Sequence, residues 1–393
     1  MRTLAAGEDP FADVVAAPQV VVNAAALSEP QWTDNLLLRK EVYLLFATSD
    51  ETDGIMSRLS AGFEVQKRFS TATRTLASVD YQGRLVYRDR MRDTSVDPMG
   101  HDASPWEYET HNAYLDFYNL FGGPGRFNLR CGYFYQPFGL NQQTDTHGTI
   151  LQLSNDRLFG SDRDGQAILY GTLTDDLDYT VGYLLGAGPD FKLAGQTGMG
   201  IARVALNSDW LFRRGLEVGM SVAAGERVSE YDRMRMESSV TNNPAMARRA
   251  DTPARNAMAG SMIGNDPLIT TFRAGLDVRK RMDSTIGPFT LTGEAAMGTD
   301  DGDPILSGLT QADWLNPGRR WGVAAHVQYF RREGSEEHDH AEESRATFVL
   351  TRYFRNDVGN ASLHWVALAV AQDLQPSDGP DDTLAMVHYY RYW

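Results

Sequence analysis

Arginines recur at the polar positions of two segments in which apolar and polar side chains alternate. Arg84 and Arg88 belong to the first segment, and Arg126 and Arg130 belong to the second. Guanidinium groups fixed in a narrow aqueous lumen would attract anions and orient phosphate or carboxylate groups. The alternative is a lattice of salt bridges that only holds the wall of the lumen together. Both interpretations need a closed sheet, because only a closed sheet surrounds a lumen.

The charges on the polar positions of the alternating segments are nearly balanced, and we expect these positions to line the pore. The basic set is Arg68, Arg84, Arg88, Arg126, Arg130, Arg273 and Arg279. The acidic set is Glu64, Asp80, Asp178, Glu217, Asp277 and Glu294. Seven basic residues against six acidic ones leave no strong field along the wall, so the sequence does not support anion selectivity.

A polar stretch over residues 138–163 follows the second of these segments. It contains Gln142, Gln143, Asp145, His147 and Arg157. Folded into the lumen, this stretch would narrow the passage as a constriction loop and set its size limit. The alternative is a loop on the surface with no gating role.

An acidic run with two histidines lies between two later alternating segments. Its members are Glu333, Glu336, Glu337, His338, Asp339, His340, Glu342 and Glu343. Imidazoles at 338 and 340 beside carboxylates are a candidate site for a borderline cation such as zinc. The run has no geometric frame, so a solvated acidic loop is the favoured interpretation. We expect no metal and no cofactor.

Enzyme signatures do not stand out in the sequence. Neither Gly-x-Ser-x-Gly nor a P-loop nor His-Glu-x-x-His is present. The single cysteine, Cys131, excludes an internal disulfide and a thiolate metal cluster, and no Cys-x-x-Cys-His attaches a haem. We therefore expect that the chain is not an enzyme.

Period-two alternation of apolar and polar residues recurs along nearly the whole chain and indicates strands of roughly ten residues. The clear segments are 59–66, 77–88, 126–135, 177–185, 216–222, 272–279, 289–297, 321–329 and 383–393, and weaker ones lie near 36–47, 107–119, 165–174, 199–207, 344–355 and 361–372. This is a count of about fifteen strands. Single-chain bacterial barrels normally have an even number, so we expect sixteen.

The connections between these segments are of two kinds. Thr174-Asp-Asp176 is a tight turn, whereas long polar stretches cover 89–106, 138–163, 226–268, 299–319 and 331–343. Short turns on one rim and long loops on the other are typical of outer-membrane proteins. The sequence predicts an all-β fold over residues 36–393, a transmembrane antiparallel β-barrel of about sixteen strands. Residues 1–35 are expected to form an N-terminal periplasmic segment.

Composition and charge narrow the class of protein further. No segment approaches twenty consecutive apolar residues, which excludes a transmembrane helix but not a barrel. A net charge of −15 argues against binding to nucleic acid. Only Lys40, Lys67, Lys192 and Lys280 are lysines, a bias towards arginine that genome base composition explains.

The two ends of the chain give opposite indications about a location in the outer membrane. At the C-terminus, Ala385, Val387, Tyr389 and Trp393 share one face, and aromatic rings there suit a bilayer boundary, where Arg391 can snorkel. The first ten residues lack the apolar stretch of a signal peptide, which an outer-membrane protein needs. We expect that the numbering starts at a processed or misassigned N-terminus. A soluble or periplasmic β-protein is the alternative.

About sixty residues resemble the phosphate-selective porin O and P superfamily. The resemblance is carried by the segments 130–140 (RCGYFYQPFGL), 155–158 (NDRL), 162–166 (DRDGQ) and 170–179 (YGTLTDDLDY), followed by 186–188 (GAG). It implies an outer-membrane barrel of about sixteen strands that passes small solutes, often as a trimer. The Arg and Lys ladder that phosphate selectivity needs is not clear in this chain.

We therefore expect a porin of the bacterial outer membrane that allows passive diffusion of small solutes or ions. The expected partners are membrane lipid and lipopolysaccharide, and a homotrimer is expected from the resemblance. The alternative from another class is a barrel sheath that encloses a partner protein, such as a multihaem cytochrome in a transmembrane electron conduit. Conductance of the protein alone would favour the pore, and haem absorbance in a purified complex would favour the sheath.

Overall fold

A computed structural model shows the architecture of the chain. It describes residues 35–49, 55–71, 74–89, 106–122, 125–140, 163–187, 197–206, 215–228, 268–333, 341–357, 362–375 and 383–393. Within these ranges, no helix has both the length and the apolar character that crossing a membrane would require.

Sixteen strands account for nearly all of the described residues. In chain order they are β1 (Leu36–Ser49), β2 (Met56–Ser70), β3 (Thr75–Asp89), β4 (Trp106–Phe117), β5 (Asn128–Tyr135), β6 (Arg163–Thr174), β7 (Leu177–Leu184), β8 (Gly198–Leu206), β9 (Leu216–Val228), β10 (Leu268–Met282), β11 (Phe289–Asp300), β12 (Asp303–Leu315), β13 (Trp321–Arg332), β14 (Ala341–Asp357), β15 (Ser362–Gln375) and β16 (Thr383–Tyr392).

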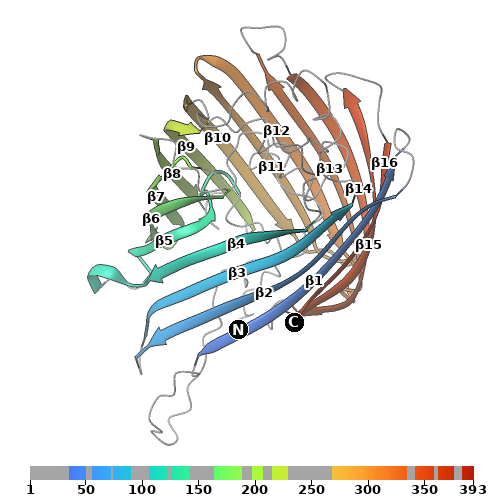
Figure 1. Ribbon diagram of the computed structural model, residues 1–393, viewed down its shortest axis with the longest axis horizontal. Coiled ribbons are helices and arrows are strands. Elements are labelled where there is room, and N and C mark those ends of the chain that lie inside the picture. The colour runs from blue at the N-terminus through green and yellow to red at the C-terminus, as the bar shows by residue number, and fades with distance from the viewer. Residues whose placement is uncertain are drawn as a thin grey trace, which may run out of the picture.

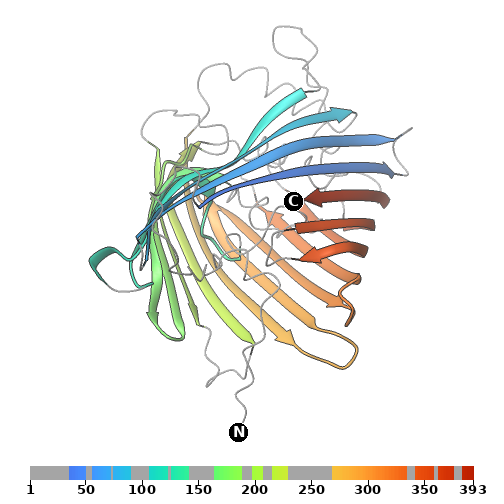
Figure 2. The ribbon, with the colours of Figure 1, turned by 90° about the horizontal axis from the view of Figure 1, so that it is seen from below.

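The strands form one closed antiparallel barrel in which each strand pairs with its neighbours in the sequence. The ring closes where β1 pairs with β16, with Glu41 opposite Tyr392 and Ser49 opposite Leu384. Figures 1 and 2 both show the blue first strand beside the red last strands, across this seam. The fold class and the expected number of strands are confirmed.

The outer face of the barrel is apolar, because the alternating positions point outward as predicted. Exposed side chains on this face include Phe63, Leu85, Val181, Met220, Leu276, Met297, Val327 and Val387. Their neighbours in the sequence point inward and are mostly polar, as in β10, where buried Arg273 and Asp277 alternate with exposed Phe272 and Leu276. Alternation of this kind gives one sheet a water-facing lumen and a lipid-compatible exterior.

One predicted loop was wrong. Residues 299–319 were expected to be a long polar connection, but they contain β12. Its outward positions include Gly308, Thr310 and Ala312, which are small or mildly polar and hide the apolar period. The turn into β12 is a two-residue hairpin at Asp301 and Gly302, with φ angles of 49° and 96°. Positive φ at both positions is typical of a type I′ turn, for which Asp-Gly is a favoured sequence.

Most of the short connections lie on one rim, while the other rim carries the long connections together with the two-residue hairpin between β11 and β12. The tight turn predicted at 174–176 is present, because β6 ends at Thr174 and β7 begins at Leu177. The turns from β10 to β11 and from β12 to β13 lie on the same rim and are also short. We call this edge the short-turn rim. On the other rim, part of the predicted 331–343 loop belongs to the ends of β13 and β14.

Candidate functional site

Ion pairs line one part of the lumen, and the first of them crosses three strands. The guanidinium of Arg84 on β3 donates to the carboxylate of Glu41 on β1, and both side chains are buried. The hydroxyl of Tyr390 on β16 donates to the same carboxylate over 3.3 Å. This contact ties the last strand to the first on the lumen side. Gly62, between the two charged residues on β2, leaves the space that they occupy.

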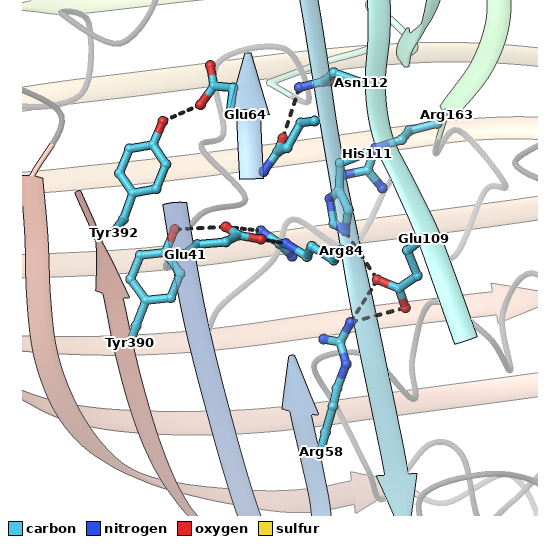
Figure 3. A network of polar contacts seen from close by, with 11 residues as sticks. Glu41, Arg58, Glu64, Arg84, Glu109, His111, Asn112, Arg163, Tyr390 and Tyr392 are labelled. Carbon is cyan, nitrogen blue, oxygen red and sulfur yellow. Dashed lines mark hydrogen bonds and ion pairs between the residues drawn. The ribbon is translucent and has the colours of Figure 1, made fainter. Parts of the chain in front are cut away.

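A second group of charges surrounds Glu109 on β4. Both oxygens of its carboxylate accept from Arg58 on β2, at 3.1 and 2.9 Å. The Nε2 atom of His111 lies 3.1 Å from the same carboxylate, and its Nδ1 atom lies 2.9 Å from Arg163 on β6. Figure 3 shows these side chains beside the Arg84 pair, together with Tyr392, whose hydroxyl donates to Glu64. The charged side chains of β1–β4 thus hold one another in fixed positions.

Arg130 on β5 forms a bidentate pair with Asp116 on β4, with both N–O distances at 2.9 Å. Its guanidinium carbon also lies 4.2 Å from the ring centroid of Tyr114 and 5.5 Å from that of Tyr170. A planar guanidinium with two aligned acceptors and aromatic neighbours is held in one orientation. Arg130 is therefore a fixed part of the wall.

The opposite part of the lumen carries a chain of four charges across β8–β10. Arg203 donates to Asp277 at 2.8 Å and approaches Glu217 at 3.4 Å, while Arg279 donates to the other oxygen of Glu217 at 2.5 Å. Two bases and two acids thus neutralise each other within this chain. Arg273 similarly donates to Asp300 at 2.7 Å.

These contacts favour the salt-bridge lattice over a ladder of exposed cations. We call this set the ion-paired wall; it consists of Glu41, Arg58, Arg84, Glu109, Asp116, Arg130, Arg203, Glu217, Arg273, Asp277, Arg279 and Asp300. Six of the predicted pore-lining residues, Arg84, Arg130, Glu217, Arg273, Asp277 and Arg279, belong to it. Cross-strand contacts fix their positions, which a linear pattern cannot specify.

A different chemistry covers the lumen side of β14–β16, β1 and the start of β2. This face, which we call the apolar wall, consists of Tyr43, Leu45, Ala47, Met56, Val349, Trp365, Ala367, Ala369, Ala371, Leu384, Met386, Tyr390 and Tyr392. Within it, His388 is fully buried and shares a 2.7 Å hydrogen bond with the hydroxyl of Tyr43. On β15 and β16 the inner face is therefore as apolar as the outer one.

A short segment after β5 crosses the lumen. Gln136–Leu140, the infolded segment, is buried throughout. The amide of Gly139 donates to the hydroxyl of Ser221 on β9 at 2.9 Å, and the amide of Leu140 approaches Glu294 on β11 at 3.4 Å. Both acceptors lie far from β5 around the ring, so this segment lies against the opposite wall.

Phe138 anchors the infolded segment. Its ring is fully buried in a cluster of lumen-facing apolar residues from β7 to β13, namely Leu184, Met199, Ile201, Ala223, Ala296, Ile305 and Phe330. A Cβ atom at Gly275 on β10 would lie 3.0 Å from this ring, so the glycine makes room for it. Gly139 next to it has a φ of 57°, a conformation that favours glycine.

The remaining predicted site residues lie elsewhere. Arg126 was placed on a strand, but it lies exposed in the turn before β5, because β5 begins only at Asn128. Arg88 is in β3 opposite Arg58, and the structure does not describe its side chain. Asp178, near the short-turn rim, accepts from the hydroxyl of Thr172 at 2.8 Å.

Two groups of predicted residues lie outside the described residues. These are the constriction-loop residues Gln142, Gln143, Asp145, His147 and Arg157, and the metal candidates His338 and His340. Among the residues that the structure describes, no group of three or more His, Cys, Asp or Glu side chains is arranged to hold a metal ion.

Sequence reasoning missed several members of the ion-paired wall. Glu41 and Arg203 are on strands whose alternation was weak, and Arg58 lies one residue before the alternating segment 59–66, because β2 begins earlier, at Met56. Asp300 ends a strand that was predicted, and its carboxylate was assigned to a loop. A charged residue in a run of other charged residues, such as Glu41 after Arg39 and Lys40, does not show from the sequence alone which face of the strand it is on.

Comparison with known proteins supports the fold. No protein-family model matches the chain, and no curated protein matches it in sequence. Among solved structures, it is similar to OprB of Pseudomonas putida, with a TM-score of 0.56 and 9% identity over 92% of this chain and 94% of that one. OmpF of Salmonella typhi, in complex with daunomycin, gives 0.55 and 12% over 92% and 99%.

A third similar structure is the trimer form of OmpT, an outer membrane protein of Vibrio cholerae, with a TM-score of 0.52 and 8% identity over 91% of this chain and 99% of that one. All three alignments cover nearly the whole barrel. At these identities the likeness concerns the fold alone. The chain has the closed sixteen-stranded antiparallel barrel fold of the bacterial outer-membrane porins.

Proposed function

We propose that the protein is a porin of the bacterial outer membrane that allows passive diffusion of small solutes or ions. The observation that carries this proposal is the combination of an apolar outer face with a lumen lined by fixed charges. A barrel with water on both sides would not be expected to carry an apolar outer face. The short-turn rim faces the periplasm, as is general for such barrels.

The passage is narrow, and the infolded segment sets its size limit. Phe138 and Gly139 support this part of the proposal, because they hold the start of the 138–163 stretch against the far wall. Solutes then pass between this segment and the ion pairs of β1–β5. Since the basic side chains of the ion-paired wall are paired with acids, selection by charge is weak. The finer expectation of a phosphate-selective pore therefore has little support from the wall.

Planar-bilayer recording of the purified protein tests this function. We expect stepwise conductance with little preference between cations and anions. Strong anion selectivity would contradict the balanced wall, and a protein that inserts without conducting would contradict the pore. A lumen occupied by a multihaem cytochrome, the alternative, would be recognised by haem absorbance in the complex isolated from its natural host.

The role of the infolded segment is tested by Gly139→Ala. The new Cβ atom would collide with the carboxylate of Glu294 and would strain a positive φ. We expect the segment to shift away from β11, and single-channel conductance to rise. Gly318→Ala is the matched control, because its Cβ atom would lie in ordinary contact at 3.6 Å. Equal conductance in both variants would show that the segment does not limit the passage.

We also propose that the barrel forms a homotrimer in the membrane. The support is the similar OmpT structure, which is described as a trimer form. Mass measurement by light scattering in detergent distinguishes a trimer from a single barrel of 43.7 kDa. A monomer in several mild detergents would contradict this assembly. Binding of lipopolysaccharide stays a prediction.

A further inference from the structure

Basic side chains gather on the outer face of β14–β16 and β1, close to the short-turn rim. Arg355 on β14 lies directly opposite His364 on β15, and His364 lies directly opposite Arg391 on β16. Lys40 on β1 is paired with Trp393, two residues from Arg391, so it is the diagonal neighbour of Arg391. Arg355, Arg391 and Lys40 are exposed. We call these three residues the basic rim patch.

The basic rim patch has no internal counter-charge. Within the described part of the chain, none of its three side chains forms an ion pair, whereas the lumen arginines described above are paired with acids. The acidic residue that follows on the same outer face of β14 is Asp357, two positions beyond Arg355. Like charges close together on a sheet repel each other, so this arrangement favours an external anion.

Aromatic rings place the patch at the boundary of the apolar belt. The guanidinium carbon of Arg391 lies 4.6 Å from the ring centroid of Trp393, and that of Arg352 on β14 lies 4.8 Å from the ring centroid of Trp321. Trp393 is 42% exposed and Phe354 is 59% exposed on the same face. Tryptophan rings are enriched at the level of the lipid headgroups. The cations therefore lie at the depth of the lipid phosphates.

We propose that the basic rim patch binds the phosphate group of anionic phospholipids in the periplasmic leaflet. Arg391 and Arg355 would each donate to phosphate oxygens, Lys40 would add a third positive charge, and the aromatic rings would contact the glycerol and upper acyl chains. This inference rests on the proposed membrane location. It is independent of whether the lumen conducts, because every residue involved is on the outer face.

Native mass spectrometry of the detergent-solubilised barrel tests the proposal. Phosphatidylglycerol and phosphatidylcholine of equal chain length are titrated into wild-type protein and into the triple variant Lys40→Gln, Arg355→Gln, Arg391→Gln. We expect wild type to prefer phosphatidylglycerol, and the triple variant to bind it on the order of tenfold or more weakly. The matched control removes three outer or turn cations elsewhere, with Lys280→Gln, Arg319→Gln and Arg320→Gln, and is expected to keep the preference.

Equal affinity for both lipids in wild type would overturn the proposal, and so would equal losses in the triple variant and the control. Full competition by inorganic phosphate at lipid-equivalent concentration would overturn the assignment to a lipid. Heat-modifiable migration on a gel shows that each variant is folded. If the triple variant fails to fold, Arg391→Gln and Lys40→Gln are measured singly and must each weaken binding. Loss of conductance with intact lipid preference would count against the pore and not against the patch.

Discussion

The ion-paired wall and the apolar wall surround the same lumen but are stabilised by opposite means. The first depends on charges that neutralise each other across strands, as in the pair of Arg84 with Glu41. The second depends on close packing of rings and alanines, with Trp365 beside a run of Ala367, Ala369 and Ala371 on one strand. Removing one member should therefore have different consequences on the two walls. A missing charge leaves a buried partner, and a missing apolar group leaves a cavity.

The largest effect is expected from breaking the pair between β1 and β3. Arg84→Met leaves the buried carboxylate of Glu41 without its guanidinium, which should lower the free energy of unfolding by about 3–5 kcal/mol. The double variant Arg84→Met, Glu41→Leu removes both charges and should recover most of that loss. Urea unfolding in detergent micelles, monitored by gel migration, measures the free energy of unfolding of the single and the double variant. A double variant as unstable as the single one would show that the loss does not come from the unpaired carboxylate of Glu41.

A somewhat smaller effect is expected on the apolar wall, and two adjacent residues of β16 provide it with an internal control. Met386 points into the lumen cluster and is buried, whereas Val387 points outward. Met386→Ala should cost about 2–4 kcal/mol through loss of buried contacts and the cavity left behind. Val387→Ala should cost less than about 1 kcal/mol, because lipid or detergent fills the space. Similar losses for both would mean that this wall is not a packed core.

The smallest effect is expected from an ion pair outside both walls. Arg331 and Glu333 lie 2.5 Å apart, and their side chains are 43% and 48% exposed. Such exposed pairs contribute about 0–1 kcal/mol and weaken with salt. Arg331→Gln should therefore change the unfolding midpoint little at low salt and not at all at about 0.5 M salt. A loss as large as that of Arg84→Met would remove the distinction between buried and exposed pairs.

The sequence was informative about faces and uninformative about partners. Alternation identified the outward positions of β10 and β13 because their apolar side chains are large, such as Phe272 and Trp321. It failed for β12, whose outer face carries Gly308 and Ala312. The positions of the strands in the sequence also did not show which acidic residue Arg203 would contact. That residue meets Asp277 across β9 only because of the register of three strands.

The sequence indicated part of the candidate site, namely a segment that enters the lumen, but not the apolar wall. The stretch that follows Pro137 was expected to enter the lumen as one of two alternatives, and the structure places its first residues there. The apolar wall was not foreseen, since an inward Ala369 and an outward Val370 give an unbroken apolar run in which the two faces cannot be told apart. Such runs lose the period that identifies a half-buried strand.

The seam between the first and last strands has a consequence for how this protein matures. The contact of Tyr390 with Glu41 joins residues 349 positions apart, so the ring cannot be completed until β16 has been synthesised and exported. Until then β1 and the newest strand both present unpaired backbone, the kind of edge that recruits foreign strands and aggregates. A nascent copy therefore depends on a chaperone that covers both open strand edges at once, and deletion of residues 383–393, which include β16, should leave it in that aggregation-prone form.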